Sequence, residues 1–89
     1  MPKISKSHTT PRFENKFRRL PDDIQKITAR KILLFENNPF HPGLNTHKLK
    51  GSLSKFWSFY VTKNYRVFFR FLENNEAIYY DVDTHDIYK

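Results

Sequence analysis

The spacing of apolar residues changes once along this chain, from the period of a helix to the period of a strand. Up to about residue 37, apolar positions recur every three or four residues, as on one face of an α-helix. From residue 57 onward they alternate with polar positions, as in strands that bury one side. Residues 40–46 lie between the two parts and are rich in Pro, Gly and Asn, which is typical of a loop. The pattern predicts two helices followed by an antiparallel sheet.

Local signals mark the ends of the two helices. Thr10 and Pro11 predict the first start, because a hydroxyl cap followed by proline suits the first helical turn. The second helix is expected over residues 22–37. It follows Pro21, its first turn is acidic, and an Asn-Asn-Pro run ends it. Two consecutive helices with a short connection favour an antiparallel helical hairpin.

The alternating part predicts an antiparallel meander of three strands, with short edge strands at residues 3–8 and 47–50. The helices should cover its apolar face. The predicted fold is therefore α+β, with an N-terminal helical hairpin packed on one face of a small twisted antiparallel β-sheet. Strict alternation assigns to the core face Trp57, Phe59, Val61, Tyr65, Val67, Phe69, Phe71, Ile78, Tyr80 and Val82, and to the opposite face Ser58, Tyr60, Thr62, Arg66, Phe68, Arg70, Tyr79, Asp81 and Asp83.

Charge and composition narrow the class of protein. The 16 Lys and Arg outnumber the 9 Asp and Glu and give a formal net charge of +7, which favours a polyanionic partner over a basic protein without one. The chain has no cysteine and no apolar run near the ~20 residues of a membrane span, and its first residues lack an apolar signal-peptide core. We expect one domain over residues 1–89, in the cytoplasm and with no membrane partner.

Two arginines on one strand are candidate phosphate ligands. Arg66 and Arg70 are four residues apart and therefore share a face, where they could stabilise a pentavalent phosphate intermediate. The alternative is that they form ion pairs with Asp81 and Asp83 on the neighbouring strand. Tyr60, Phe68 and Tyr79 could stack on RNA bases beside them, or could simply pack within the sheet.

Histidines could supply proton transfer near neutral pH. His85 follows the last strand and is either catalytic or structural. His47 opens the sequence His-Lys-Leu-Lys-Gly, in which Lys48 and Lys50 could contact RNA, or could protect an edge strand from aggregation. Tyr88 could stack on a base or donate a hydrogen bond to a phosphate. No spacing typical of metal ligands occurs, and we expect no cofactor.

An ordered set of short motifs resembles the RelE/ParE toxin superfamily along nearly the whole chain. The resemblance implies a bacterial toxin of a type II toxin–antitoxin pair, with a helical hairpin on a twisted antiparallel sheet. The motifs are Leu20-Pro21-x-x-Ile24, Asn38-Pro39-x-His41-Pro42-Gly43-Leu44, His47-x-Leu49-x-Gly51, Trp57-Ser58, Tyr65-Arg66-Val67 and Thr84-His85-Asp86-x-Tyr88.

For the RelE, YafQ and YoeB branch, the resemblance implies a metal-independent endoribonuclease that cuts mRNA in the A site of the 70S ribosome and is held by a cognate antitoxin. The 2′-hydroxyl attacks the adjacent phosphate. Arg66 matches the strand arginine of this branch, His47 and His85 match histidines of YafQ-like and YoeB-like members, and Tyr88 matches a C-terminal aromatic. Lys48, Lys50, Arg70 and Tyr60 are the expected RNA contacts.

One position departs from RelE itself and leaves a rival function open. RelE carries lysines on the strand where this chain has Ser58 and Tyr60. The resemblance therefore favours a mechanism based on histidines, with Arg66 stabilising the phosphorane. The ParE branch shares the fold but inhibits DNA gyrase without cutting RNA. His47, Arg66 and His85 favour the nuclease, because an inhibitor needs no groups that transfer protons.

Overall fold

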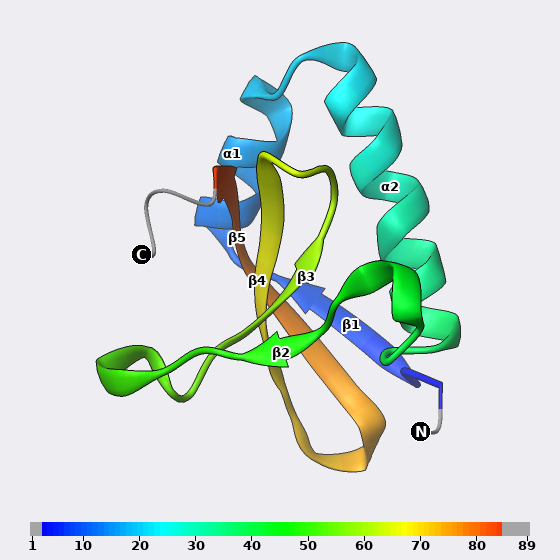
Figure 1. The fold of residues 1–89 in the computed structure, drawn as a ribbon, viewed down its shortest axis with the longest axis vertical. Coiled ribbons are helices and arrows are strands. Elements are labelled where there is room, and N and C mark those ends of the chain that lie inside the picture. Colours follow the sequence, from blue (N-terminus) through cyan, green and yellow to red (C-terminus); the bar gives the residue numbers. More distant parts are fainter. Residues whose placement is uncertain (1–2, 85–89) are drawn as a thin grey trace.

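The computed structural model of the chain describes residues 3–84. In this range, two helices pack on a five-stranded sheet with the strand order β1-β5-β4-β3-β2 (Figure 1). Strand β1 runs parallel to β5, and the other neighbouring strands are antiparallel. The elements are β1 (Lys6–Thr9), α1 (Pro11–Arg19), α2 (Asp22–Asn37), the short 3₁₀ turn η1 (Pro42–Leu44), β2 (His47–Lys48), η2 (Gly51–Leu53), β3 (Trp57–Tyr60), β4 (Tyr65–Phe71), η3 (Glu73–Asn75) and β5 (Glu76–Thr84).

The predicted fold class and helix limits are confirmed. The Thr10 hydroxyl caps α1 and accepts a hydrogen bond of 3.0 Å from the Phe13 amide, while Pro11 occupies the first helical position. Helix α2 begins directly after Pro21 and ends at Asn37, as the sequence predicted. None of the helices within residues 3–84 is both long and apolar enough to cross a membrane.

Strand β1 makes the sheet mixed, whereas the sequence predicted an antiparallel one. It pairs with the first half of β5, from Lys6 opposite Glu76 to Thr9 opposite Tyr79. Parallel pairing requires a long connection, and here the whole chain from α1 to η3 lies between the two strands. The residues of β1 therefore do not indicate whether the strand pairs in a parallel or an antiparallel direction.

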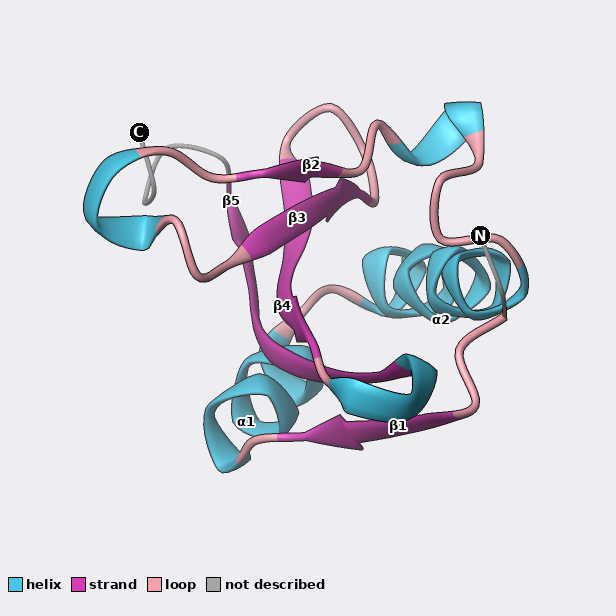
Figure 2. Ribbon diagram, turned by 90° about the horizontal axis from the view of Figure 1, so that it is seen from below, coloured by secondary structure: helices cyan, strands magenta, loops and turns pink. Residues whose placement is uncertain are grey.

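Aromatic side chains form the core between the helices and one face of the sheet. Phe35 of α2 is fully buried, with ring centroids 4.7 Å from Phe59 and 4.6 Å from Phe69. Helix α1 adds the buried Phe13, whose ring lies 5.7 Å from that of Tyr79. The sheet is strongly twisted and curls around α2, while α1 lies beside β5 (Figure 2).

Strand β5 departs from strict alternation because it contains a β-bulge. Phe68 pairs with Asp81 but Phe69 pairs with Tyr79, so Tyr80 is an extra residue without an opposite partner. The prediction that Ile78 and Tyr80 lie on the core face and Tyr79 on the polar face is therefore wrong. Ile78 pairs with Arg70, Tyr79 is 2% exposed and Tyr80 is 39% exposed. Burial, together with a 2.5 Å hydrogen bond that Tyr79 donates to Glu36, raises the pKa of Tyr79 well above its ordinary value.

Candidate functional site

A basic pocket opens on the sheet face opposite the aromatic core. It has a volume of about 190 Å³ and lies where β2, β3 and β4 adjoin. Five residues singled out from the sequence meet in its walls, although they come from two strands and a loop. The residues that line this basic pocket are His47, Lys48, Leu49, Lys50, Ser58, Arg66 and Phe68.

The backbone before β2 orients the imidazole of His47. Its Nδ1 donates a 2.8 Å hydrogen bond to the carbonyl oxygen of Asn45, a residue in the left-handed conformation that asparagine tolerates. A carbonyl can only accept, so Nδ1 carries the proton and Nε2 of the neutral ring keeps its lone pair. This Nε2 lies 3.5 Å from Oγ of the buried Ser58, the residue opposite His47 in the sheet. His47 can therefore accept a proton from a ligand on the Nε2 side.

Arg66 provides a fixed cation in the same pocket. It pairs with Tyr60 across β3 and β4, and its guanidinium carbon lies 4.6 Å from the centroid of the Tyr60 ring. This cation–π contact helps to hold the half-buried guanidinium in place. Tyr60 thus helps to position Arg66, and its expected contact with RNA stays a prediction.

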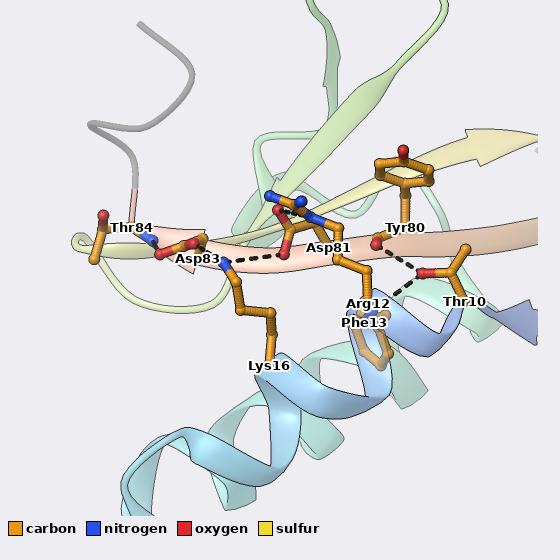
Figure 3. A network of polar contacts seen from close by, with 8 residues as sticks. All are labelled: Thr10, Arg12, Phe13, Lys16, Tyr80, Asp81, Asp83 and Thr84. Carbon is orange, nitrogen blue, oxygen red and sulfur yellow. Dashed lines mark hydrogen bonds and ion pairs between the residues drawn. The ribbon is translucent and has the colours of Figure 1, made fainter.

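The two aspartates of β5 form ion pairs with helix α1. Arg12 Nε lies 3.0 Å from Asp81 Oδ2, and Lys16 forms ion pairs with Asp83 and, at 3.5 Å, with Asp81 (Figure 3). Helix α1 therefore supplies cations to both aspartates. Among residues 3–84, no carboxylate lines the basic pocket, while three cationic side chains do. The arrangement can hold the negative charge of a phosphate beside a proton acceptor.

Other predicted residues lie elsewhere. Arg70 is exposed on the same face as Arg66 but does not line the pocket. Tyr79 cannot stack on a base because it is in the core. His85 and Tyr88 lie outside the described residues. Among residues 3–84, no group of three or more His, Asp or Glu side chains gathers as a metal site would require.

Two residues that support the pocket were not singled out from the sequence as site residues. Ser58 is fully buried beside His47, and Asn45 supplies the carbonyl that sets the imidazole tautomer. Ser58 carried one signal, since it is a small polar residue between Trp57 and Phe59. Asn45 carried the weaker signal of an asparagine just after a Pro-Gly turn.

A comparison with known protein families identifies the family of this chain. Residues 6–85 match the HigB-like toxin family, described as the RelE-like toxin of the type II toxin–antitoxin system HigB. The chain belongs to this family. The resemblance to the RelE/ParE superfamily is thereby confirmed. No curated protein sequence matches the chain.

Solved structures of toxins share the fold of this RelE-like chain at low sequence identity. A YoeB/ParE toxin from Agrobacterium tumefaciens matches with a TM-score of 0.76 and 18% identity, covering 90% of this chain and 98% of that one. The RelBE2 toxin–antitoxin complex from Mycobacterium tuberculosis matches with a TM-score of 0.76 and 16% identity over 96% and 100% of the two chains. The DinJ–YafQ toxin–antitoxin complex of E. coli matches with a TM-score of 0.70 and 15% identity over 91% and 92%.

Proposed function

We propose that this RelE-like toxin is a metal-independent endoribonuclease that cuts mRNA in the A site of the 70S ribosome and so blocks translation. Membership of the RelE-like toxin family supports the proposal. The observation that carries it is the basic pocket, which brings together a histidine with an oriented Nε2, an arginine in contact with an aromatic ring, and two lysines. Proton transfer and phosphate stabilisation are the two tasks that RNA cleavage requires.

The chemical step needs no group beyond the RNA and the protein. The ribose 2′-hydroxyl loses its proton and attacks the adjacent phosphorus to form a pentavalent phosphorane. The bond to the 5′-oxygen then breaks, and that oxygen takes up a proton. The products are a 2′,3′-cyclic phosphate and a 5′-hydroxyl. Arg66 stabilises the extra negative charge of the phosphorane, because its position is set before the substrate arrives.

His47 is the candidate base, because its protonated Nδ1 is engaged with Asn45 and its Nε2 lies on the side of Ser58 in the pocket. His85 is proposed as the complementary acid that protonates the 5′-oxygen, and Tyr88 as a group that orients the phosphate. Lys48 and Lys50 are exposed in or beside the pocket and would hold neighbouring phosphates, with Arg70 further along the face.

An antitoxin is the proposed protein partner. Two of the structural relatives are solved as toxin–antitoxin complexes. This chain has a formal net charge of +7 and an open basic pocket, which fits an acidic antitoxin segment that folds on binding and covers the pocket. The partner would thereby keep the toxin inactive until it is removed.

A toeprint on translating ribosomes tests the function. Purified protein should create a sharp new mRNA end inside the A-site codon. His47→Gln keeps a hydrogen-bonding group but cannot transfer a proton near neutral pH, so single-turnover cleavage should slow by about 10²–10⁴-fold. His8→Gln is the matched control, because His8 lies on β1 at the opposite edge of the sheet and should not change the rate.

Other outcomes would contradict the proposal. A parental rate of cleavage for His47→Gln would show that His47 is not the base. Growth arrest by the parental protein without any new mRNA end would instead support a ParE-like inhibitor of DNA gyrase.

A further inference from the structure

A second pocket adjoins the basic pocket on the same face of the sheet. Its volume is about 230 Å³, and it shares the walls Leu49 and Phe68 with the basic pocket. Apart from one arginine, its lining is aliphatic and aromatic. The residues around this aromatic pocket are Arg12, Leu49, Leu53, Phe56, Phe68 and Tyr80.

The β-bulge of β5 places Tyr80 in this pocket. Without the extra residue, alternation would turn Tyr80 into the core, as the sequence predicted. Its ring instead lies 4.9 Å from that of Phe56, while its backbone oxygen accepts a 2.9 Å hydrogen bond from the Thr10 hydroxyl (Figure 3). The ring remains 39% exposed although its backbone is fixed at the start of α1. An exposed aromatic ring on a fixed backbone offers a flat, preorganised contact.

Arg12 contributes a polar group that is held in position. Its Nε donates to Asp81 Oδ2 at 3.0 Å, and Asp81 is fully buried, so the guanidinium is tied to the sheet. The side chain is nevertheless 50% exposed and lines the aromatic pocket. Aromatic rings and guanidinium planes are the groups on which proteins stack unpaired RNA bases.

We propose that the aromatic pocket binds one nucleobase, that of the nucleotide next to the scissile phosphate. This inference rests on the proposed ribonuclease function. Arg66 of the basic pocket and Phe68, which lines both pockets, are two residues apart on one face of β4, about 7 Å along the strand. That spacing suits a phosphate in the basic pocket and an adjoining base in the aromatic one. The volume lies below the several hundred Å³ usual for drug-sized ligands and suits a single ring system.

An apolar side chain of a bound protein segment is the competing occupant. The continuity with a cationic pocket favours RNA, because a strand that places its phosphate beside Arg66 carries a base at the required reach. The arginine also favours a base, because a nucleobase can stack on the plane of a guanidinium.

The test compares single-turnover cleavage of two kinds of synthetic mRNA on programmed ribosomes. One carries normal nucleotides, and the other carries an abasic nucleotide next to the scissile phosphate, placed in turn on each side. On normal mRNA, Tyr80→Ala should lower kcat/KM by about 10-fold or more, the effect typical of one lost base stack. At one of the two abasic positions, the parental protein should lose as much, and Tyr80→Ala should lose nothing further.

Phe40→Ala is the matched control, because Phe40 is an aromatic residue of similar exposure (43%) that packs against Trp57 and Phe71, away from this pocket. It should cut both mRNAs at parental rates. Leu53→Trp, which narrows the pocket from η2, should reproduce the Tyr80→Ala pattern if the fold measured by circular dichroism is kept.

The outcomes separate the two proposals. The parental protein and Tyr80→Ala could instead lose the same factor in cleavage rate when the base is absent. That result would overturn the base pocket, leave the ribonuclease proposal intact and support a protein segment as the occupant. Absence of cleavage by the parental protein would overturn the ribonuclease and the base pocket together.

Discussion

The two faces of the sheet are built on the same strands but differ in how their residues are held. On the covered face, Val67 and Phe69 are fully buried and make contacts that depend on shape alone. On the open face, the neighbouring Arg66 is half-buried and is held by the ring of Tyr60. One face therefore contributes most of the free energy of folding, and the other carries charge that can act on a ligand. Substitutions should separate stability from activity according to the face they alter.

The largest effect on stability is expected from the centre of the covered face. Phe35→Ala removes a fully buried ring that packs on Phe59 and Phe69, and should lower the free energy of unfolding by about 3–5 kcal/mol. Leu33→Ala is the control on the same helix, because Leu33 is 62% exposed, and should cost under about 1 kcal/mol. Urea unfolding measures both. Equal losses would mean that α2 is not seated on the sheet as described.

The open face should show the reverse behaviour. Arg66→Ala should slow mRNA cleavage by about 10²–10³-fold, because one preorganised stabiliser of the phosphorane is lost. Loss of the cation–π contact should cost no more than about 1 kcal/mol of stability. Arg66→Lys should restore activity in part, since an ammonium cannot form two parallel hydrogen bonds to a phosphate. Arg30→Ala on the exposed side of α2 is the control. Cleavage at the parental rate by Arg66→Ala would make Arg66 structural.

Substitutions in helix α1 should affect both the stability and the aromatic pocket. Arg12 lines the aromatic pocket and also pairs with the fully buried Asp81. Arg12→Met should therefore lower stability by about 2 kcal/mol, because a buried carboxylate is left with Lys16 as its remaining helix partner. Adding Asp81→Asn should recover part of that loss by removing the buried charge. Thermal unfolding of the single and double variants measures the coupling, and strict additivity would show that the ion pair contributes nothing.

The smallest effect concerns the neighbouring tyrosines on opposite faces. The pKa of Tyr79 is raised above its ordinary value of 10.0 in the folded protein, mainly by burial, so the folded state holds this proton where the unfolded state loses it. The contribution of the Tyr79 proton to the free energy of unfolding is complete below about pH 10. Above pH 10, this contribution should fall by about 1.4 kcal/mol for each pH unit. Tyr79→Phe should remove this part of the slope, whereas Tyr80→Phe should not. The same slope in both variants would contradict the burial of Tyr79.

Much of the fold could be predicted because its signals are local. Thr10 caps α1 through an amide three residues away, and the Asn-Asn-Pro run ends α2 within one turn. The alternation of β4 assigns Arg66 and Val67 to opposite faces without reference to any other strand. Candidate site residues such as His47 and Arg66 were found from residue type and from the superfamily resemblance, and the sheet brings them into one pocket.

Tertiary structure decided what depends on residues far apart in the chain. The bulge at Tyr80 follows from the pairing of β5 with Phe68 and Phe69, and it reversed the faces predicted for Ile78 and for two tyrosines. Three other features likewise depend on partners that the local pattern does not specify. They are the direction of β1, the ion pair between Arg12 and Asp81, and the tautomer of His47. A residue's own sequence neighbours determine its backbone preference, but the sheet that forms around it determines which atoms it meets.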